Sequence, residues 1–73
     1  MRGDFIPLPF DIDEIFEIDQ KRFVVLDYRR ASNWKDWGAW MLIQDEQGKT
    51  YSVPLLHVLT QRQMGKAQYR GKR

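Results

Sequence analysis

The sequence predicts a small α+β domain, in which a curled antiparallel sheet of three to four strands precedes a short C-terminal helix and a disordered basic tail. Three observations lead to this fold class. Short apolar runs suited to strands lie between residues 11 and 53, a leucine pattern of helical spacing follows Pro54, and the last residues are polar and basic. With 73 residues, the chain has room for only one small core.

Residues 1–10 lack a periodic pattern and contain two prolines, Pro7 and Pro9. Each proline favours an extended backbone for itself and for the residue before it. The stretch FIPLPF is therefore predicted to form an extended apolar arm. The arm either covers the core as a lid or docks on a partner, and we favour the lid because so small a core needs covering.

The stretch DIDEIFEID allows two interpretations. Ile12, Phe16 and Ile18 suit one face of a strand, whereas Ile12, Ile15 and Phe16 suit one stripe of a helix. Isoleucine and phenylalanine are enriched in strands, so we favour a strand.

The stretch RFVVLDYR is the clearest predicted strand. Phe23 and Val25 share one face, and the other face carries three further apolar residues, which are Val24, Leu26 and Tyr28. Apolar side chains on both faces are typical of a central or strongly curled strand.

The run WGAWMLIQ is predicted to form the next strand. Alternation places Trp37, Met41 and Ile43 on one face, and Trp40 and Leu42 on the other.

A hairpin loop, DEQG, follows, in which Gly48 supplies the positive φ that such loops need. KTYSV then returns as the partner strand. Pro54 suits the first turn of a helix, and LLHVLTQRQM continues with helical spacing until Gly65. After Gly65 no pattern can bury surface, so the tail is predicted to be disordered when free.

These elements divide the chain into an arm (1–10), a domain (11–64) and a basic tail (65–73). In outline, GAWMLIQDEQGKTYSVPLLHV is similar to the second half of an SH3-like barrel, in which a tryptophan strand and a glycine hairpin precede a proline turn. The resemblance covers only part of the chain. It implies a barrel-like curl of the sheet, but peptide binding does not follow from it.

The composition argues against catalysis and against metal binding. The chain has no cysteine and one histidine, His57, which lies in the leucine-rich start of the predicted helix. A zinc site needs more ligands of these types, and a nucleophilic site needs a base oriented by a third group. GKT at 48–50 lacks the upstream glycine of a phosphate-binding loop, because Ile43 stands there. We therefore expect no catalytic residue, no metal and no cofactor.

Charge is unevenly distributed along the chain. Residues 1–20 hold six acidic side chains and one basic one, whereas residues 62–73 hold five basic side chains and no acidic one. Such a tail either approaches nucleic acid or only aids solubility. The residues predicted to lie near nucleic acid are Lys66, Tyr69, Arg70, Lys72 and Arg73.

Three tryptophans, Trp34, Trp37 and Trp40, are spaced three residues apart. Trp34 is predicted to lie in an exposed loop, while Trp37 or Trp40 fills the core. An exposed tryptophan among basic residues either stacks on bases or anchors a protein interface, although it can also fold over arginine stems. The predicted partner-binding residues are Arg29, Arg30, Trp34, Lys35 and Trp37.

A protein partner fits the charges better than nucleic acid does, because the acidic first quarter of the chain opposes a long phosphate track. We therefore predict a binding module and not an enzyme. The alternatives are a stand-alone SH3-like module that binds RNA or single strands, and an inhibitor of another host protein.

The whole chain resembles a family of small phage-encoded regulators of host RNA polymerase. The resemblance rests on the opening MRGDFIPLPFDIDEIFEID, the cluster NWKDWGAW and the tail QYRGKR. It implies binding near the RNA exit channel, through the β′ N-terminus and the flap. It also implies inhibition of sigma-dependent initiation and readthrough of intrinsic terminators. We expect a monomer in the cytoplasm of the infected host, without membrane contact, and no family motif assigns individual contact residues.

Overall fold

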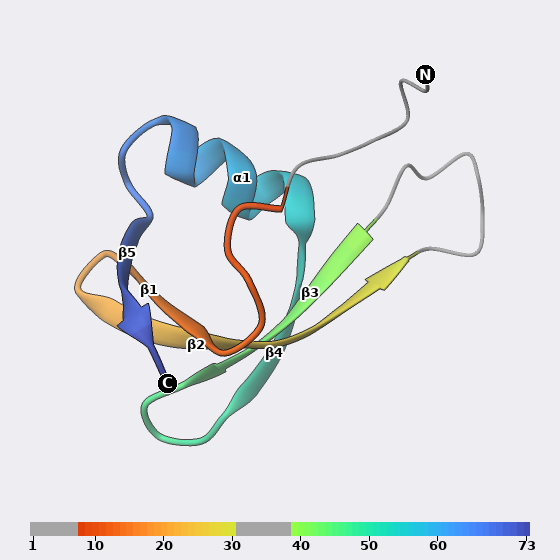
Figure 1. The fold of residues 1–73 in the computed structure, drawn as a ribbon, viewed down its shortest axis with the longest axis vertical. Helices are drawn as coiled ribbons and strands as arrows, with labels where there is room; N and C mark the ends of the chain where they lie inside the picture. The colour runs from red at the N-terminus through yellow and green to blue at the C-terminus, as the bar shows by residue number, and fades with distance from the viewer. Residues whose placement is uncertain (1–7, 31–38) are drawn as a thin grey trace.

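A computed structural model describes residues 8–30 and 39–73 (Figure 1). The elements, in chain order, are β1 (Glu14–Ile18), β2 (Lys21–Arg30), β3 (Ala39–Asp45), β4 (Thr50–Pro54), α1 (Leu55–Gln63) and β5 (Gln68–Lys72). The strands form one antiparallel sheet in the order β4-β3-β2-β1-β5. The predicted α+β class is confirmed. The sheet has one strand more than predicted and is curled but not closed into a barrel, so β4 and β5 are its edges.

The segment 11–19 contains the favoured strand, β1. A turn precedes it, in which the backbone N–H of Asp11 donates to the Glu14 carboxylate (2.7 Å) and the N–H of Glu14 donates to the Asp11 carbonyl (3.0 Å). After β1 the chain reverses through Asp19 and Gln20, which both have positive φ, 53° and 67°. Two such residues match the right-handed twist of the flanking strands, so β1 and β2 form a tight hairpin.

The strand β2 differs from the simple alternation in its second half. Val25 pairs with Ile43 but Asp27 pairs with Leu42, so Leu26 is an extra residue in the ladder. Such a bulge shifts the facing of every later side chain by one position. Tyr28 therefore packs against the core on the same side as Phe23 and Val25, which corrects the expectation that it shares a face with Val24.

The core lies between the concave face of the sheet and a cover made by α1 and the segment before β1 (Figure 1). Its buried side chains are Phe10, Phe16, Val25, Met41, Ile43, Leu55, Val58 and Ala67. Burying a phenylalanine or leucine contributes about 1.5–3 kcal/mol, so these few residues carry most of the stability of the fold.

The end of the predicted arm is part of this cover. Phe10 is 2% exposed and its ring stacks on Phe16 at 4.8 Å, whereas Leu8 is 49% exposed. Tyr28 donates its hydroxyl proton to the Phe10 carbonyl, and Arg62 donates to the carbonyl of Pro9. Pro9 and Phe10 thus occupy the position of a lid, while residues 1–7 of the predicted arm lie outside the described residues.

The hairpin and the helix follow the sequence pattern closely. Asp45 accepts hydrogen bonds from the backbone of Gln47 and Lys49 (both 2.9 Å), and Gly48 has φ of 89°. The helix buries Leu55 and Val58, whereas Leu56 is 50% exposed. Positions 55 and 58 lie about one turn apart on one side of the helix, and position 56 turns away from them.

The basic tail corrects the prediction of disorder, because residues 68–72 form β5 along the free edge of β1. The edge of β1 offers unpaired backbone groups, and β5 satisfies them. Ala67 is buried just before the strand, and Arg73 donates its N–H to the Asp13 carbonyl (2.7 Å) just after it. The strand itself buries almost no side chain, which explains why its sequence shows no apolar pattern.

Candidate functional site

The convex face of the sheet carries an exposed row of three side chains at one end. In the ladder, Arg29 of β2 lies opposite Trp40 of β3, and Trp40 lies opposite Pro54 of β4. Met41 and Ile43 point into the core, so alternation directs Trp40 to the convex side. Trp40 is 40% exposed, and Arg29 and Pro54 are exposed on either side of it.

Side chains of this kind suit a protein interface. Tryptophan and arginine are enriched among the residues that dominate binding energy, because each combines a large contact area with a polar group. Half-buried Leu42 lies two residues from Trp40 on the same face of β3, with exposed Asp27 opposite it, so Trp40 belongs to a surface of mixed polarity. No described helix or strand covers the convex side here. We call Arg29, Trp40 and Pro54 the convex row.

Of the two tryptophans predicted as candidates for the core, only Trp40 lies among the described residues. Trp40 does not fill the core, because Met41 and Ile43 already occupy the inward positions of β3. Alternation places Trp40 on the face opposite Met41 and Ile43, although the sequence alone leaves Trp40 as one of two candidates for the core. The sequence does not reveal that Trp40 belongs to an exposed row, because Pro54 becomes its neighbour only when β3 pairs with β4.

The five predicted partner-binding residues are described only in part. Arg29 is exposed on β2, and Arg30 ends that strand opposite Ala39. Trp34, Lys35 and Trp37 lie in 31–38, outside the described residues. The chain enters and leaves that segment from β2 and β3, next to the convex row.

The tail residues predicted to lie near nucleic acid are brought together on and beside β5, but two of them are engaged by the acidic front of the chain. Arg70 Nε lies 3.2 Å from Glu17 Oε1, and an Arg73 guanidinium nitrogen lies 2.8 Å from Asp13 Oδ1. Arg22 also contacts Glu17, at 3.3 Å. The hydrogen bond from Arg70, with a smaller contribution from Arg22, lowers the pKa of Glu17 from its ordinary value of 4.5.

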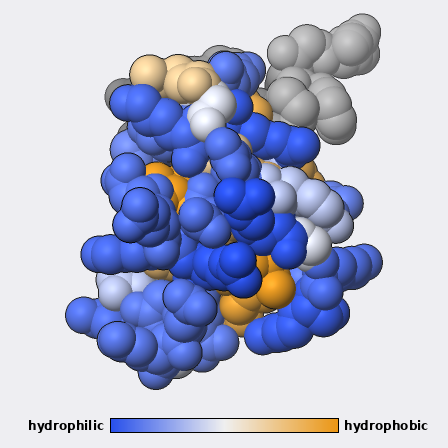
Figure 2. Space-filling model, turned by 90° about the vertical axis from the view of Figure 1, so that its left-hand side faces the viewer, coloured by the Kyte–Doolittle hydropathy of each residue, from blue (hydrophilic) through white to orange (hydrophobic). Residues whose placement is uncertain are grey.

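Because of these ion pairs, the uneven charge distribution along the sequence does not produce separate acidic and basic ends in the folded domain. The acidic strand β1 and the basic strand β5 lie side by side, so opposite charges that are separated in the sequence meet in the sheet. Figure 2 shows a predominantly hydrophilic surface on this side of the molecule, with only small hydrophobic areas. Lys66 and Lys72 make no ion pair with any described residue, and Tyr69 is 50% exposed. These three residues can contact an anion without breaking an ion pair, while the paired Arg70 and Arg73 side chains remain 39% and 53% exposed.

Potential catalytic and metal-binding groups are dispersed in the described part of the chain. Within 8–30 and 39–73, no three histidine, aspartate or glutamate side chains gather where they could hold a metal ion. His57 is exposed on α1, and within those same ranges no hydrogen bond joins its side chain to an acid or a nucleophile.

In the described ranges, α1 is far shorter than the apolar helix needed to cross a bilayer, and no other helix qualifies. Comparison with known proteins gave no match to the chain among protein-family models, curated proteins or solved structures.

Proposed function

We propose that this protein is a non-catalytic, phage-encoded regulator that binds bacterial RNA polymerase in the cytoplasm of the infected cell. It inhibits sigma-dependent initiation and promotes readthrough of intrinsic terminators. The proposed place of binding is the β′ N-terminus and the flap, near the RNA exit channel. This proposal rests on the sequence resemblance through MRGDFIPLPFDIDEIFEID, NWKDWGAW and QYRGKR.

The structural observation that supports a binding role is the convex row. An exposed tryptophan between an arginine and a proline, on a sheet face that no described element covers, is suited to a protein partner. The protein is small, so it acts by occupying a surface of the polymerase and excluding other contacts there. No bond needs to be made or broken.

The direct test is binding of purified protein to purified bacterial polymerase core enzyme, with Trp40→Ala as the test variant. Truncating an interface tryptophan typically costs 2 kcal/mol or more, so we expect affinity to fall by about thirtyfold. Leu56→Ala is the matched control, because Leu56 is also an exposed apolar residue but lies on α1. Absence of binding by the wild-type protein, or equal losses in the two variants, would contradict the proposal.

A separate test concerns the tail. Truncation at Gly65 would remove β5 as well as the charges, so the better variant is Lys66→Ala with Lys72→Ala. If these lysines contact the emerging RNA, the double variant weakens terminator readthrough, and the wild-type effect declines with salt. Unchanged readthrough would remove the tail from the mechanism while leaving polymerase binding intact.

The nucleic-acid alternative is tested by a gel shift without polymerase. A stand-alone RNA-binding module would retain RNA at low salt and lose it steeply as salt rises. The ion pairs of Arg70 and Arg73 with β1-side carboxylates reduce the free positive charge of the tail, which argues for the polymerase-binding alternative.

A further inference from the structure

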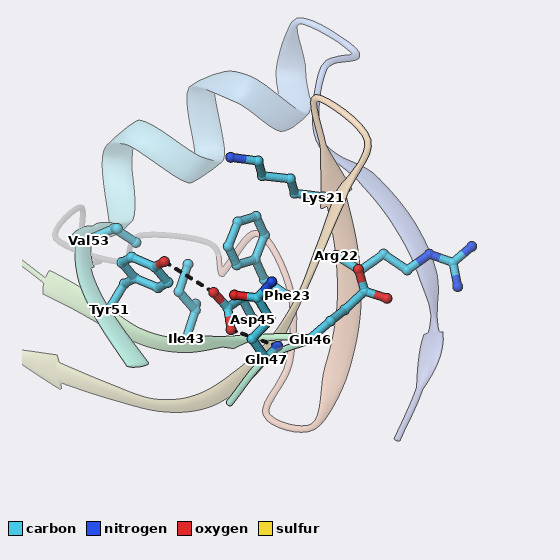
Figure 3. Close-up of a pocket in the computed structure, with 9 residues that line it drawn as sticks. All are labelled: Lys21, Arg22, Phe23, Ile43, Asp45, Glu46, Gln47, Tyr51 and Val53. Carbon is cyan, nitrogen blue, oxygen red and sulfur yellow. Dashed lines mark hydrogen bonds between the residues drawn. The ribbon is translucent and has the colours of Figure 1, made fainter. Parts of the chain in front are cut away.

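The concave face of the sheet is hollowed near the hairpin between β3 and β4, below α1 in the view of Figure 3. The hollow has a volume of about 420 Å³, within the range of about 300–1,000 Å³ typical of binding pockets. Its apolar lining comes from three neighbouring strands: Phe23 of β2, Ile43 of β3, and Tyr51 and Val53 of β4.

One wall of this hollow is also an edge of the sheet. The strand β4 pairs with β3 without a register shift, and no strand of the described residues pairs with its other side. The N–H of Asp45 donates to the Lys49 carbonyl (2.9 Å), so the antiparallel alternation directs the backbone of Tyr51 and Val53 toward β3. The same alternation directs the N–H and C=O of Thr50 and Ser52 toward the open edge.

The two edges of the sheet differ in how they resist further pairing. The strand β5 carries Arg70 and Lys72, has a register shift against β1, and contains Gly71 with φ of 107°. Charge and irregularity are the features by which proteins protect an edge. The strand β4, TYSVP, has no charged residue and no bulge, and only Pro54 at its end lacks an N–H.

A strand added to β4 would lie about 4.8 Å from it. Every second side chain of the added strand would then stand beside Tyr51 and Val53, at the mouth of the hollow. Hydrogen bonds to the backbone of β4 would provide affinity, and the hollow would provide specificity by accepting an apolar side chain. This is how affinity and specificity usually arise when a peptide adds to a sheet as a strand.

The charges around the hollow favour a peptide over a nucleic acid. Lys21 and Arg22 stand on its rim together with Asp45 and Glu46, and Lys49 lies over the Tyr51 ring (5.4 Å), so these five groups leave one formal positive charge. A single excess positive charge gives a phosphate chain little to bind. A nucleic acid also lacks the regular N–H and C=O groups that an open strand edge can pair with.

We propose that β4 and the adjacent hollow form a docking site for an extended segment of a partner protein, which adds as a strand beside β4 and places one large apolar side chain against Phe23, Ile43 and Tyr51. The site shares only Pro54, at the end of β4, with the convex row, since it lies at the open edge and on the concave side of the sheet. It does not require that the partner be a polymerase.

The test uses the isolated protein and a displayed library of short random peptides. Enriched peptides are synthesised and titrated into isotope-labelled protein, with amide and side-chain shifts followed by NMR. We expect the largest changes at Thr50 and Ser52 and at the rings of Phe23 and Tyr51. Changes confined to other residues, or a library that yields no peptide shifting these signals, would overturn the proposal. This mapping needs no variant.

Ser52→Pro sharpens the test, because it removes an edge N–H that β3 does not use. We expect affinity for the enriched peptides to fall by about tenfold or more. Ser52→Thr is the matched control, because it keeps the N–H, and it should bind as the wild-type protein does. Equal affinity of the proline and threonine variants would overturn strand addition.

Two further readouts separate other occupants of the site. A uridine oligonucleotide that shifts the same residues as strongly as the peptides would replace the peptide with nucleic acid. Shifts of Thr50 and Ser52 that grow with protein concentration alone would assign the edge to a second copy of this chain. Either result would overturn the proposal, and neither depends on whether polymerase binds.

Discussion

Two aromatic groups lie on the same concave face of the sheet, and they differ in what covers them. The covered pair, Phe10 and Phe16, stacks nearly parallel, with ring centroids 4.8 Å apart and planes 7° apart. The open pair, Phe23 and Tyr51, meets edge to face, at 6.2 Å and 84°. Phe16 and Phe23 join the two pairs at 5.6 Å, so the face carries one continuous aromatic chain.

The difference between the pairs comes from the segment before β1. Phe10 fills the space above Phe16, and Arg62 of α1 lies 4.7 Å above the Phe10 ring. Lys49 lies over the Tyr51 ring (5.4 Å from Nζ to the centroid), but beside Phe23 and Tyr51 the described residues leave the hollow open (Figure 3). Stability is therefore concentrated at the covered pair, and accessible apolar surface at the open pair.

The largest effect is expected from Phe10→Ala, which removes one ring of the covered pair. Replacing a fully buried phenylalanine by alanine typically costs about 3–5 kcal/mol, because a cavity remains. A domain this small has little reserve, so we expect Phe10→Ala to be largely unfolded in thermal or denaturant melts. Leu8→Ala, in the same segment but exposed, is the control and should melt as the wild type does. A stable Phe10→Ala variant would show that the segment is not part of the core.

A smaller effect is expected from Tyr28→Phe. This variant loses the hydrogen bond to the Phe10 carbonyl, at a typical net cost of about 0.5–1.5 kcal/mol. Desolvation raises the pKa of Tyr28 to about 12, against an ordinary value of 10.0.

The folded state therefore holds the Tyr28 proton more tightly than the unfolded state does. The resulting contribution to stability is complete below pH 10 and is lost as the pH rises toward about 12. Denaturant unfolding at a series of alkaline pH values would measure this loss. A wild-type curve that is parallel to the Tyr28→Phe curve throughout this window would contradict the assignment.

The smallest effect is expected from Tyr51→Phe, at the open pair. The Tyr51 hydroxyl donates to Asp45 Oδ2 (3.1 Å) but remains accessible to water, so its loss should lower the melting temperature less than Tyr28→Phe does. The pKa of Asp45 lies below its ordinary value of 3.8, first because of the Lys49 N–H and then because of Tyr51. We expect Tyr51→Phe to raise the Asp45 pKa only part of the way back, as NMR titration can measure. A full return would mean that the Lys49 hydrogen bond does not form.

The sequence predicted the elements whose side chains are buried on one face. β3 and β4 follow from alternation, β1 from the preference of isoleucine and phenylalanine for strands, the hairpin loop from Asp45 and Gly48, and the helix from Pro54 and the leucines after it. Each of these signals extends over only a few residues. Local sterics and the burial of one face require a regular spacing of apolar residues, which can be recognised in the sequence.

The prediction was wrong for the facing of Tyr28 and for β5, where the apolar spacing carries no such information. The bulge at Leu26 depends on how β2 and β3 align, and it reverses the facing of Tyr28 without any break in the apolar pattern. β5 buries almost no side chain, so its sequence has no apolar periodicity that could predict a strand. Its formation depends on the free edge of β1 and on ion pairs that join residues 53 and 60 positions apart in the chain, Glu17 with Arg70 and Asp13 with Arg73.

The sequence predicted which types of residue form the candidate site, but not where those residues lie on the sheet. One histidine and no cysteine already argued against catalysis, and the clustering of tryptophan with basic residues already indicated binding. That Arg29, Trp40 and Pro54 form a row required the pairing of three strands. Composition and short-range pattern limit which interactions a chain can make. Strand pairing over long separations determines which side chains become neighbours, and here it turned an acidic front and a basic tail into adjacent strands and left Trp40 on the surface.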